Sequence, residues 1–171
     1  MFKRSTTVLA LLVILLINGH GVEPGGAAAN LLKNGDFSAG AEFWDAEAGD
    51  IVPDPSNRSK KVLRLRLADG VCAASQKLSF RRGPLSLNFS CRLRAISASK
   101  RVPVLVRVRL YDENGNSVII GDQQISQSER WQALTIRRVE PTESMRDKLL
   151  IEAITGKGAL LLADVALRFA N

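Results

Sequence analysis

Arginines at every second position are the residues most able to do chemistry in this sequence. Arg92 and Arg94 form one such pair, and Arg107 and Arg109 form another, followed by Tyr111. A guanidinium fork binds a carboxylate or a sulfate through two parallel hydrogen bonds. If the two segments lie in one sheet, four guanidinium groups share a face and can hold a polyanion. The alternative is a solvated face whose long arginine stems cover apolar surface.

Catalytic chemistry has few candidate residues in this chain. The sequence contains one His and two Cys, which excludes a four-cysteine zinc site and a His-rich zinc site. The single His, His20, falls within the predicted leader described below, so the mature chain has none for a catalytic triad. Carboxylates are present, but none lies in a recognisable catalytic pattern. They include Asp45, Glu47, Asp50, Asp54, Glu140 and Glu152. We therefore expect that the chain is not an enzyme.

The two cysteines, Cys72 and Cys91, are expected to face the core. Cys91 shares the parity of Phe89 in its alternating segment, and Cys72 shares that of Leu78 and Phe80. In an oxidising compartment we expect a disulfide between them. It would close a loop of about twenty residues and stabilise the fold by about 3 kcal/mol. The alternative is two buried free thiols.

The first 29 residues have the features of a secretory signal peptide. Lys3 and Arg4 precede an unbroken apolar run over residues 8–17. This run is shorter than the roughly 20 residues that a membrane-spanning helix needs. Small residues follow it, and cleavage after Gly21 and cleavage after Ala29 both fit the pattern. We expect a protein that is secreted, periplasmic or at the cell surface, with no membrane span after cleavage. An uncleaved membrane anchor is the alternative.

Residues 30–171 are predicted to form one all-β domain. Apolar residues make up 46% of the chain and charged residues 24%, as in folded globular proteins. Apolar and polar residues alternate over 61–67, 85–94 and 104–111, which indicates antiparallel strands with one face on the core and one in water. Further strands are expected at 73–80, 117–126, 131–139, 149–154 and 159–169. Short strands separated by turn residues favour a β-sandwich or a barrel.

Several segments resemble a known family of modules. The opening residues 31–37, Leu-Leu-Lys-Asn-Gly-Asp-Phe, followed by Trp44, are similar to the start of jelly-roll carbohydrate-binding modules. Residues 76–95 and 129–136 are similar to middle strands of that family. Residues 149–167 resemble its closing strands, with Ala-Asp-Val where the family usually has Asp-Asp-Val.

This resemblance implies a galactose-binding-like jelly-roll β-sandwich of two antiparallel sheets, of the cellulose- or xylan-binding type. It also implies non-catalytic glycan recognition, with a polysaccharide or a cell-surface glycan as the partner. The alternative is a structural or protein-interaction module of the cell envelope that has the same fold and binds no sugar. Nucleic acid is not expected as a partner, because the chain has few exposed rings on which bases could stack.

The four arginines and Tyr111 are the predicted ligand-binding residues. Tyr111 shares its parity with Arg107 and Arg109 and is expected to face outward, where its ring can pack against the C–H face of a sugar. The arginines favour an anionic glycan, such as a uronic-acid or sulfated polymer. Trp44 and Trp131 are instead expected in the core or in packing at a strand edge.

The resemblance further implies a structural calcium ion between the opening motif and the last strand. Its ligands would include Asn34 and Asp36 from the opening motif and Asp164 from the last strand. Calcium takes six to eight oxygen ligands, including carboxylates and backbone carbonyls. The chain has Ser38 where the family has Glu. The alternative role for Asp164 is to cap a turn or to bond to the backbone.

Overall fold

The computed structural model describes residues 29–67, 70–79, 86–97, 103–126, 128, 130–141, 145–154 and 158–170. Within these ranges the regular structure consists of nine β-strands, so the prediction of an all-β chain is confirmed. The strands are β1 (Gly49–Asp54), β2 (Asn57–Leu67), β3 (Val71–Lys77), β4 (Leu87–Ser97), β5 (Val104–Tyr111), β6 (Ser117–Ile125), β7 (Gln132–Val139), β8 (Lys148–Ile154) and β9 (Gly158–Phe169).

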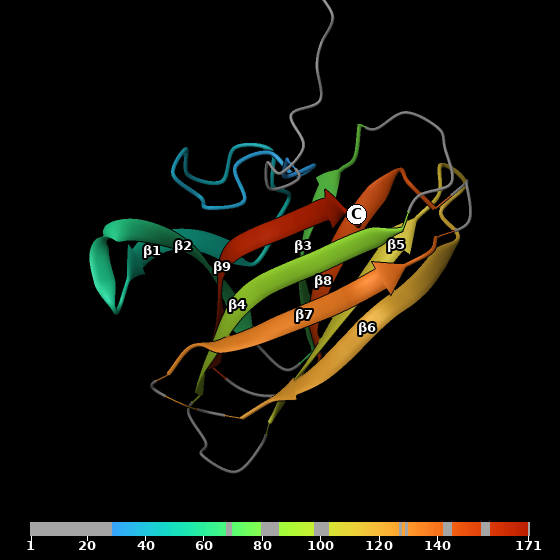
Figure 1. The fold of residues 1–171 in the computed structure, drawn as a ribbon. Helices are drawn as coiled ribbons and strands as arrows, with labels where there is room; N and C mark the ends of the chain where they lie inside the picture. Colours follow the sequence, from blue (N-terminus) through green and yellow to red (C-terminus); the bar gives the residue numbers. More distant parts are fainter. Residues whose placement is uncertain are drawn as a thin grey trace, which may run out of the picture.

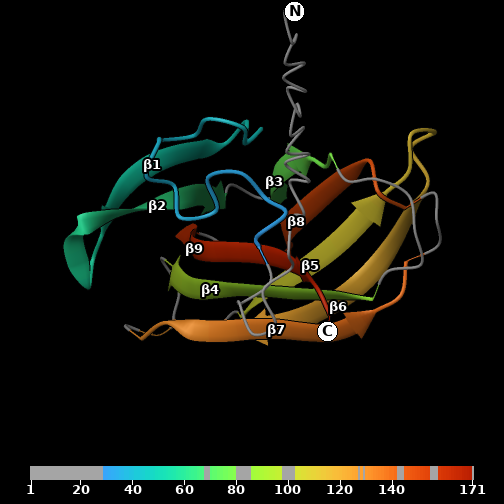
Figure 2. The same ribbon diagram turned by 45° about the horizontal axis from the view of Figure 1, so that its top comes forward.

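The strands form two antiparallel sheets packed face to face. The first has five strands in the order β1-β2-β9-β4-β7, and the second has four in the order β3-β8-β5-β6. Figures 1 and 2 show the two layers, with β9, β4 and β7 in one and β8, β5 and β6 in the other. The predicted β-sandwich of two antiparallel sheets is therefore confirmed.

Strand alternation places the core between the two sheets. Leu63 and Leu65 of β2 point inward from the five-stranded sheet, and Val106 and Val108 of β5 point inward from the other; all four are fully buried. Each such side chain contributes roughly 1.5–3 kcal/mol when it leaves water. The intervening residues of these strands lie on the outer faces of the sandwich. The period-two pattern therefore predicted the correct inner face.

The edge strand β1 was not predicted from the sequence. Its residues are mostly half-buried, because the strand lies at the edge of the sheet and pairs on one side only. Pro53 and Asp54 at its end interrupt the pairing register with β2. Proline is confined to such edges because it cannot donate a ladder hydrogen bond. A short strand with this composition lacks the alternation on which the prediction relied.

The predicted leader, residues 1–29, lies outside the described residues apart from Ala29. In the part of the chain that is described, no helix has the length and apolar character needed to cross a membrane.

The opening segment is fixed to β9 through one asparagine side chain. The Nδ2 of Asn30 donates to the carbonyl of Val165 at 2.9 Å, and its Oδ1 accepts from the amide of Leu167 at 2.9 Å. The amide of Leu31 donates to the carbonyl of Leu167 at 2.7 Å. A side chain thus satisfies backbone groups of β9 that no neighbouring strand reaches at this point. The opening motif therefore has a structural role.

Close backbone approach explains the glycine of the opening motif. The carbonyl of Gly35 accepts a hydrogen bond from the amide of Val165 at 2.8 Å. A Cβ at Gly35 would lie 2.0 Å from the carbonyl oxygen of Val165, which is far inside van der Waals contact. Next to it, the buried rings of Phe37 and Trp44 pack with centroids 5.4 Å apart. Only glycine allows the loop to dock on β9 at this distance.

Both cysteines face the core, as predicted, but the predicted disulfide is absent. Cys72 lies on β3 in the four-stranded sheet and Cys91 on β4 in the five-stranded sheet, and both are buried free thiols. The shared parity indicated that both point inward. Parity does not bring two side chains on opposite layers into the narrow geometry that a disulfide requires.

Gly35→Ala is expected to lower the free energy of unfolding by about 3 kcal/mol or more, because the added methyl group collides with the β9 backbone. Urea denaturation followed by tryptophan fluorescence measures this loss. Gly40→Ala is the control in the same loop: Gly40 has φ of 73° and a Cβ added there would meet no atom within 4 Å, so about 1 kcal/mol of backbone strain is expected. Equal losses in the two variants would contradict the close approach.

Reducing agent is expected to leave the melting temperature unchanged. Burial raises the pKa of both the Cys72 and Cys91 thiols, so little reactive thiolate forms in the folded chain. Alkylation followed by mass spectrometry should therefore label both residues only under denaturing conditions. A fall of several degrees on reduction would instead reveal a bond between them.

Candidate functional site

The two arginine pairs that were predicted to share one face lie on opposite faces of the sandwich. Arg92 and Arg94 are on β4 of the five-stranded sheet, whereas Arg107 and Arg109 are on β5 of the four-stranded sheet together with Tyr111. The prediction depended on β4 and β5 belonging to one sheet, and they do not. Alternation within a strand shows which residues point outward, but it does not show from which layer.

An apolar patch lies on the outer face of the five-stranded sheet. Val62 of β2 is paired with Val52 of β1, and Leu161 and Ala163 lie on the neighbouring strand β9. Val62, Leu161 and Ala163 are at most 2% exposed, and the ring of Trp131 packs against them. The open face of an antiparallel sheet is usually polar. Here part of that face is instead apolar and covered by side chains.

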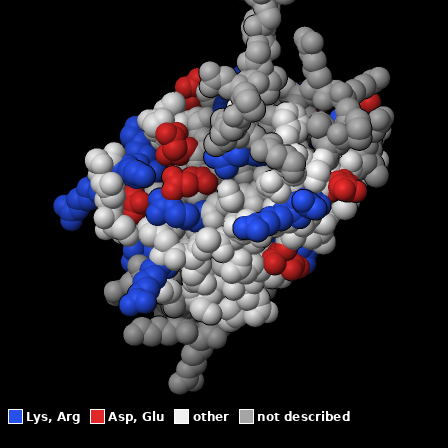
Figure 3. Space-filling view, viewed as in Figure 1, with Lys and Arg blue, Asp and Glu red and all other residues white. Residues whose placement is uncertain are grey.

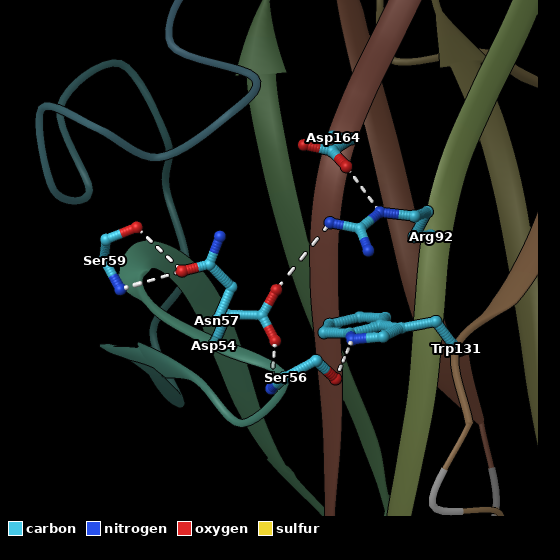
Figure 4. Close-up of polar contacts among 7 residues, drawn as sticks. All are labelled: Asp54, Ser56, Asn57, Ser59, Arg92, Trp131 and Asp164. Carbon is cyan, nitrogen blue, oxygen red and sulfur yellow. Dashed lines mark hydrogen bonds and ion pairs between the residues drawn. The ribbon is translucent and has the colours of Figure 1, made fainter.

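Arg92 connects this patch to two carboxylates (Figure 4). The centre of its guanidinium lies 4.9 Å from the centroid of the Trp131 ring, where the ring quadrupole attracts a cation. Its Nε donates to the carboxylate of Asp164, and its Nη2 lies 3.7 Å from Oδ2 of Asp54. The guanidinium of Arg92 is therefore already in contact with two carboxylates and an aromatic ring within the molecule.

The turn between β1 and β2 reaches Trp131 from the other side (Figure 4). Oδ1 of Asp54 accepts a hydrogen bond from the amide of Ser56 at 2.7 Å, and the indole Nε1 of Trp131 donates to the hydroxyl of Ser56 at 3.2 Å. Asp54 is only 1% exposed. This chain of contacts fixes the orientation of the indole, although Ser56 and Trp131 are 75 residues apart.

A bulge in β9 aims Asp164 at Arg92. Ala163 is opposite Arg92 in the ladder and Ala166 is opposite Ser90, so the register shifts between these two pairs. Asp164 has φ of 49°, in the left-handed region that Asp tolerates better than most residues. The extra residue lets Ala163 and Asp164 both face outward while Val165 returns to the core.

A second ion pair lies beside the patch, between β1 and β2. Nε of Arg64 donates to Oδ1 of Asp50 at 2.9 Å, and Nη2 of Arg66 lies 3.5 Å from Oδ2 of the same residue. The hydrogen bond from Arg64 is the main cause that lowers the pKa of Asp50 below its usual range. The same contact raises the pKa of Arg64. Asp50 is therefore ionised and neutralises part of the positive charge of β2. Figure 3 shows acidic side chains among the basic ones on this side of the molecule.

Arg94 differs from Arg64, Arg66 and Arg92 because it has no carboxylate partner among the described residues. In the ladders, Leu161 is flanked by Arg64 on β2 and by Arg94 on β4. The Nε of Arg94 is buried and has no hydrogen-bond acceptor in the described part of the chain. A buried donor without an acceptor costs roughly 1–3 kcal/mol. Because no described carboxylate pairs with its guanidinium, Arg94 is the arginine of this group that can bind an anionic group, through its terminal Nη donors rather than through the buried Nε.

The outer face of the four-stranded sheet holds the other predicted ligand residues. Nε of Arg109 donates to Oε2 of Glu152 at 2.8 Å, and its Nη1 donates to the hydroxyl of Ser117 at 3.1 Å. Tyr111 faces outward, as predicted, but it is half-buried and Nζ of Lys148 lies 4.8 Å from its ring centroid. The predicted platform is thus partly covered and lies on the face opposite Arg92 and Arg94.

The three predicted calcium ligands have other contacts. The side-chain amide of Asn34 donates to the carbonyls of Gly40 and Glu42, and its oxygen accepts from the amide of Ala39. The carboxylate of Asp36 accepts from the amide and the hydroxyl of Ser38, and these bonds lower its pKa. Asp164 is paired with Arg92. Arranged in this way, the three side chains do not fit a shared calcium ion, and calcium binding stays a prediction.

Sequence reasoning missed the residues that form the patch around Trp131. One signal was available: residues 159–163, Ala-Leu-Leu-Leu-Ala, form a continuous apolar run rather than an alternating one. Such a run indicates a strand that is buried on both faces. Ser56 and Asp54 carried no comparable signal, because their role depends on where the β1–β2 turn lies relative to β7.

Comparisons with known proteins support the fold. No protein-family model matches the sequence, and no curated protein matches it. Solved structures do match at the level of the fold. TmCBM61, solved in complex with beta-1,4-galactotriose, has a TM-score of 0.61 at 18% identity and covers 84% of this chain and 100% of its own. The CBM22-1 xylan-binding domain of Paenibacillus barcinonensis Xyn10C has a TM-score of 0.63 at 19% identity, over 84% of this chain and 96% of its own.

A third similar structure is the C-terminal family 22 carbohydrate-binding module of Clostridium thermocellum Xyn10B. Its TM-score is 0.64 at 14% identity, and it covers 85% of this chain and 98% of its own. The likeness extends over nearly the whole length of these modules. The chain therefore has the jelly-roll fold of carbohydrate-binding modules, as its sequence motifs predicted.

Arg92→Met is expected to lower the free energy of unfolding by about 3 kcal/mol, because it leaves the buried carboxylate of Asp54 without its cation. Chemical denaturation measures the change. Arg94→Met, on the same strand and without a carboxylate partner among the described residues, is the matched control and should cost less than about 1 kcal/mol. Adding Asp54→Asn to Arg92→Met should recover part of the loss in a double-mutant cycle. Equal losses at Arg92 and Arg94 would contradict this assignment.

Proposed function

We propose that this chain is a non-catalytic carbohydrate-binding module that binds a polysaccharide on the outer face of its five-stranded sheet. The observation that carries the proposal is the juxtaposition on that face of an indole ring, an apolar patch and an arginine without a carboxylate partner among the described residues. The fold supports it, because the similar structures include a module in complex with beta-1,4-galactotriose and a xylan-binding domain.

The chemistry of the face suits a sugar ring. The half-buried side chains of Trp131 and Val52 offer apolar surface to the C–H face of a sugar, above a floor of buried Val62, Leu161 and Ala163. Arg94 lies opposite Leu161, beside that surface, and its terminal Nη groups can donate to a ligand. Polar groups placed around an apolar floor fix the orientation of a ligand in small sites.

We propose an anionic glycan as the preferred ligand. Among the arginines predicted from the sequence, Arg94 supports this preference, because Arg92 and Arg109 already pair with carboxylates. Arg107, Arg109 and Tyr111 lie on the other sheet and are not part of this proposal. A uronic-acid carboxylate or a sulfate can accept two parallel hydrogen bonds from one guanidinium.

Export and the lack of catalysis are further parts of the proposal. The charged start, apolar run and small residues of the first 29 residues support secretion to the periplasm, the cell surface or the medium. Three of the six carboxylates considered for catalysis, Asp50, Asp54 and Glu152, are in ion pairs with arginines. Such pairing supports structural roles for them rather than proton transfer.

A structural or protein-interaction module of the cell envelope is the second candidate. The contacts of Trp131 favour this candidate, because they occupy part of the indole that a sugar would need. The guanidinium of Arg92 lies over the ring, and the indole N–H donates to the hydroxyl of Ser56. A sugar would have to use the part of the indole that these contacts leave open.

Affinity electrophoresis against neutral xylan and galactan and against polygalacturonate and a sulfated polysaccharide tests the proposed function. We expect retardation by an anionic polymer, and we expect it to weaken as salt is raised, because exposed charges are screened. Arg94→Ala should weaken binding about tenfold, as expected for one charge-assisted contact of about 1.4 kcal/mol.

Arg107→Ala is the matched control, since it removes the same side chain from the opposite sheet and should leave binding unchanged. Retardation by neutral polymers only would disprove the anionic preference. A chain that binds no polysaccharide and elutes with a stable protein partner would disprove the module's proposed function and support the second candidate.

A further inference from the structure

A pocket of about 480 Å³ lies on the side of the molecule away from the proposed polysaccharide face. Its apolar wall is formed by Val71 and Ala73 of β3 and Leu150 of β8, on the outer face of the four-stranded sheet. Asp45 and Glu47, from the segment that precedes β1, line its other side. The volume falls within the range of small-molecule sites.

Backbone pairing holds the two sides of this pocket together. The amide of Asp45 donates to the carbonyl of Ser75 at 2.9 Å, and the amide of Ser75 donates to the carbonyl of Asp45 at 2.8 Å. This isolated bridge attaches the segment before β1 to the edge strand β3. The pocket is therefore built by two fixed backbone segments. Because Asp45 and Ser75 are directly opposite each other in an antiparallel bridge, their side chains lie on the same face, and both line the pocket.

Ser75 supplies a hydroxyl group to the wall of the pocket. The residue is only 8% exposed and lines the pocket, and its hydroxyl has no hydrogen-bond partner among the described residues. On β3 it is opposite Leu150, so its side chain has the outward parity of the pocket wall. Although most of the residue is buried, its hydroxyl oxygen is reached from the pocket and can donate or accept a hydrogen bond there. A hydroxyl group of a ligand in the pocket can be that partner.

The charge of the pocket is opposite to that of the chain. The sequence carries a formal net charge of +7. Neither Asp45 nor Glu47 has an ion pair or a side-chain hydrogen bond in the described part of the chain, whereas Asp50, Asp54, Asp164 and Glu152 all pair with arginines. Lys148 lines the pocket, but its ammonium group lies over the ring of Tyr111. Within the described residues, the carboxylates of the pocket are thus left without a cation.

We propose that this pocket binds an amino-sugar unit, with the protonated amine at Asp45 and Glu47, a hydroxyl group on Ser75 and the C–H face of the ring on Val71, Ala73 and Leu150. An ammonium donates three hydrogen bonds, which two carboxylates can accept. The apolar wall and the unpaired hydroxyl favour a hydroxylated ring over a simple aliphatic amine. This site is separate from the proposed polysaccharide face and does not rest on that function.

Titration of the isotopically labelled chain with the glucosamine disaccharide, followed by amide NMR spectra, tests the proposal. We expect saturable shifts of the amide signals of Ala73, Ser75 and Leu150. The di-N-acetylated disaccharide has the same rings without the charge and should shift these signals at least about tenfold more weakly, as expected for two lost ion contacts. Raising the pH until the amines of the glucosamine disaccharide lose their protons should weaken its binding in the same way.

The double variant Asp45→Asn, Glu47→Gln should weaken binding about tenfold. It is expected to fold normally, because these side chains have no partner to lose among the described residues. Glu113→Gln, Asp122→Asn is the matched control, since it removes the same net charge from positions outside the pocket and should keep the affinity within about twofold. Ala73→Leu fills the pocket without changing its charge and should abolish the shifts.

Three results would overturn the proposal. The first is equal binding of the amine and its acetylated counterpart. The second is an affinity for Nα-acetyl-lysine amide equal to the affinity for the disaccharide, which would indicate a site for lysine side chains. The third is shifts caused by calcium ions at the same residues with no response to the amine. None of these results bears on the five-stranded face, whose test uses anionic polymers and Arg94.

Discussion

Burial of β9 on both of its faces is the constraint around which the molecule is arranged. Leu160 and Leu162 point into the core. On the outer face, Leu161 and Ala163 are buried together with Val62, and Val52 and Trp131 pack against them. A strand with this composition cannot lie at an exposed edge, because burial of apolar surface is the main favourable contribution to folding. It therefore lies between β2 and β4, and the opening segment bonds to its end.

The same strand organises the charges of the five-stranded sheet. Its bulge presents Asp164 to Arg92, and Arg92 in turn neutralises the buried carboxylate of Asp54. A buried carboxylate needs such a cation, because an uncompensated charge is costly in a medium of low dielectric constant. Much of the basic character of this face is thereby used within the molecule. Arg94, which flanks Leu161 of the patch, pairs with no carboxylate among the described residues.

The segment before β1 connects the two faces of the sandwich. Gly35 within it docks on β9 of one sheet, and Asp45 pairs with Ser75 of β3 in the other. The opening segment, whose motif resembles that of jelly-roll modules, thus links the two sheets by hydrogen bonds. This segment also places two carboxylates, unpaired among the described residues, beside the edge strand β3 of a basic chain. Together with residues of β3 and β8 they line a pocket.

The sequence by itself determined the all-β class, eight of the nine strands among the described residues, and the inward parity of residues such as Leu63, Val106 and Cys91. These follow from local period-two alternation, which a single strand already contains. Only the tertiary structure decided which strands share a sheet. In the resulting arrangement, Arg92 and Arg107 lie on different sheets, and Ser56 accepts a hydrogen bond from Trp131. Strand order depends on contacts between residues far apart in the chain, and no local pattern records them.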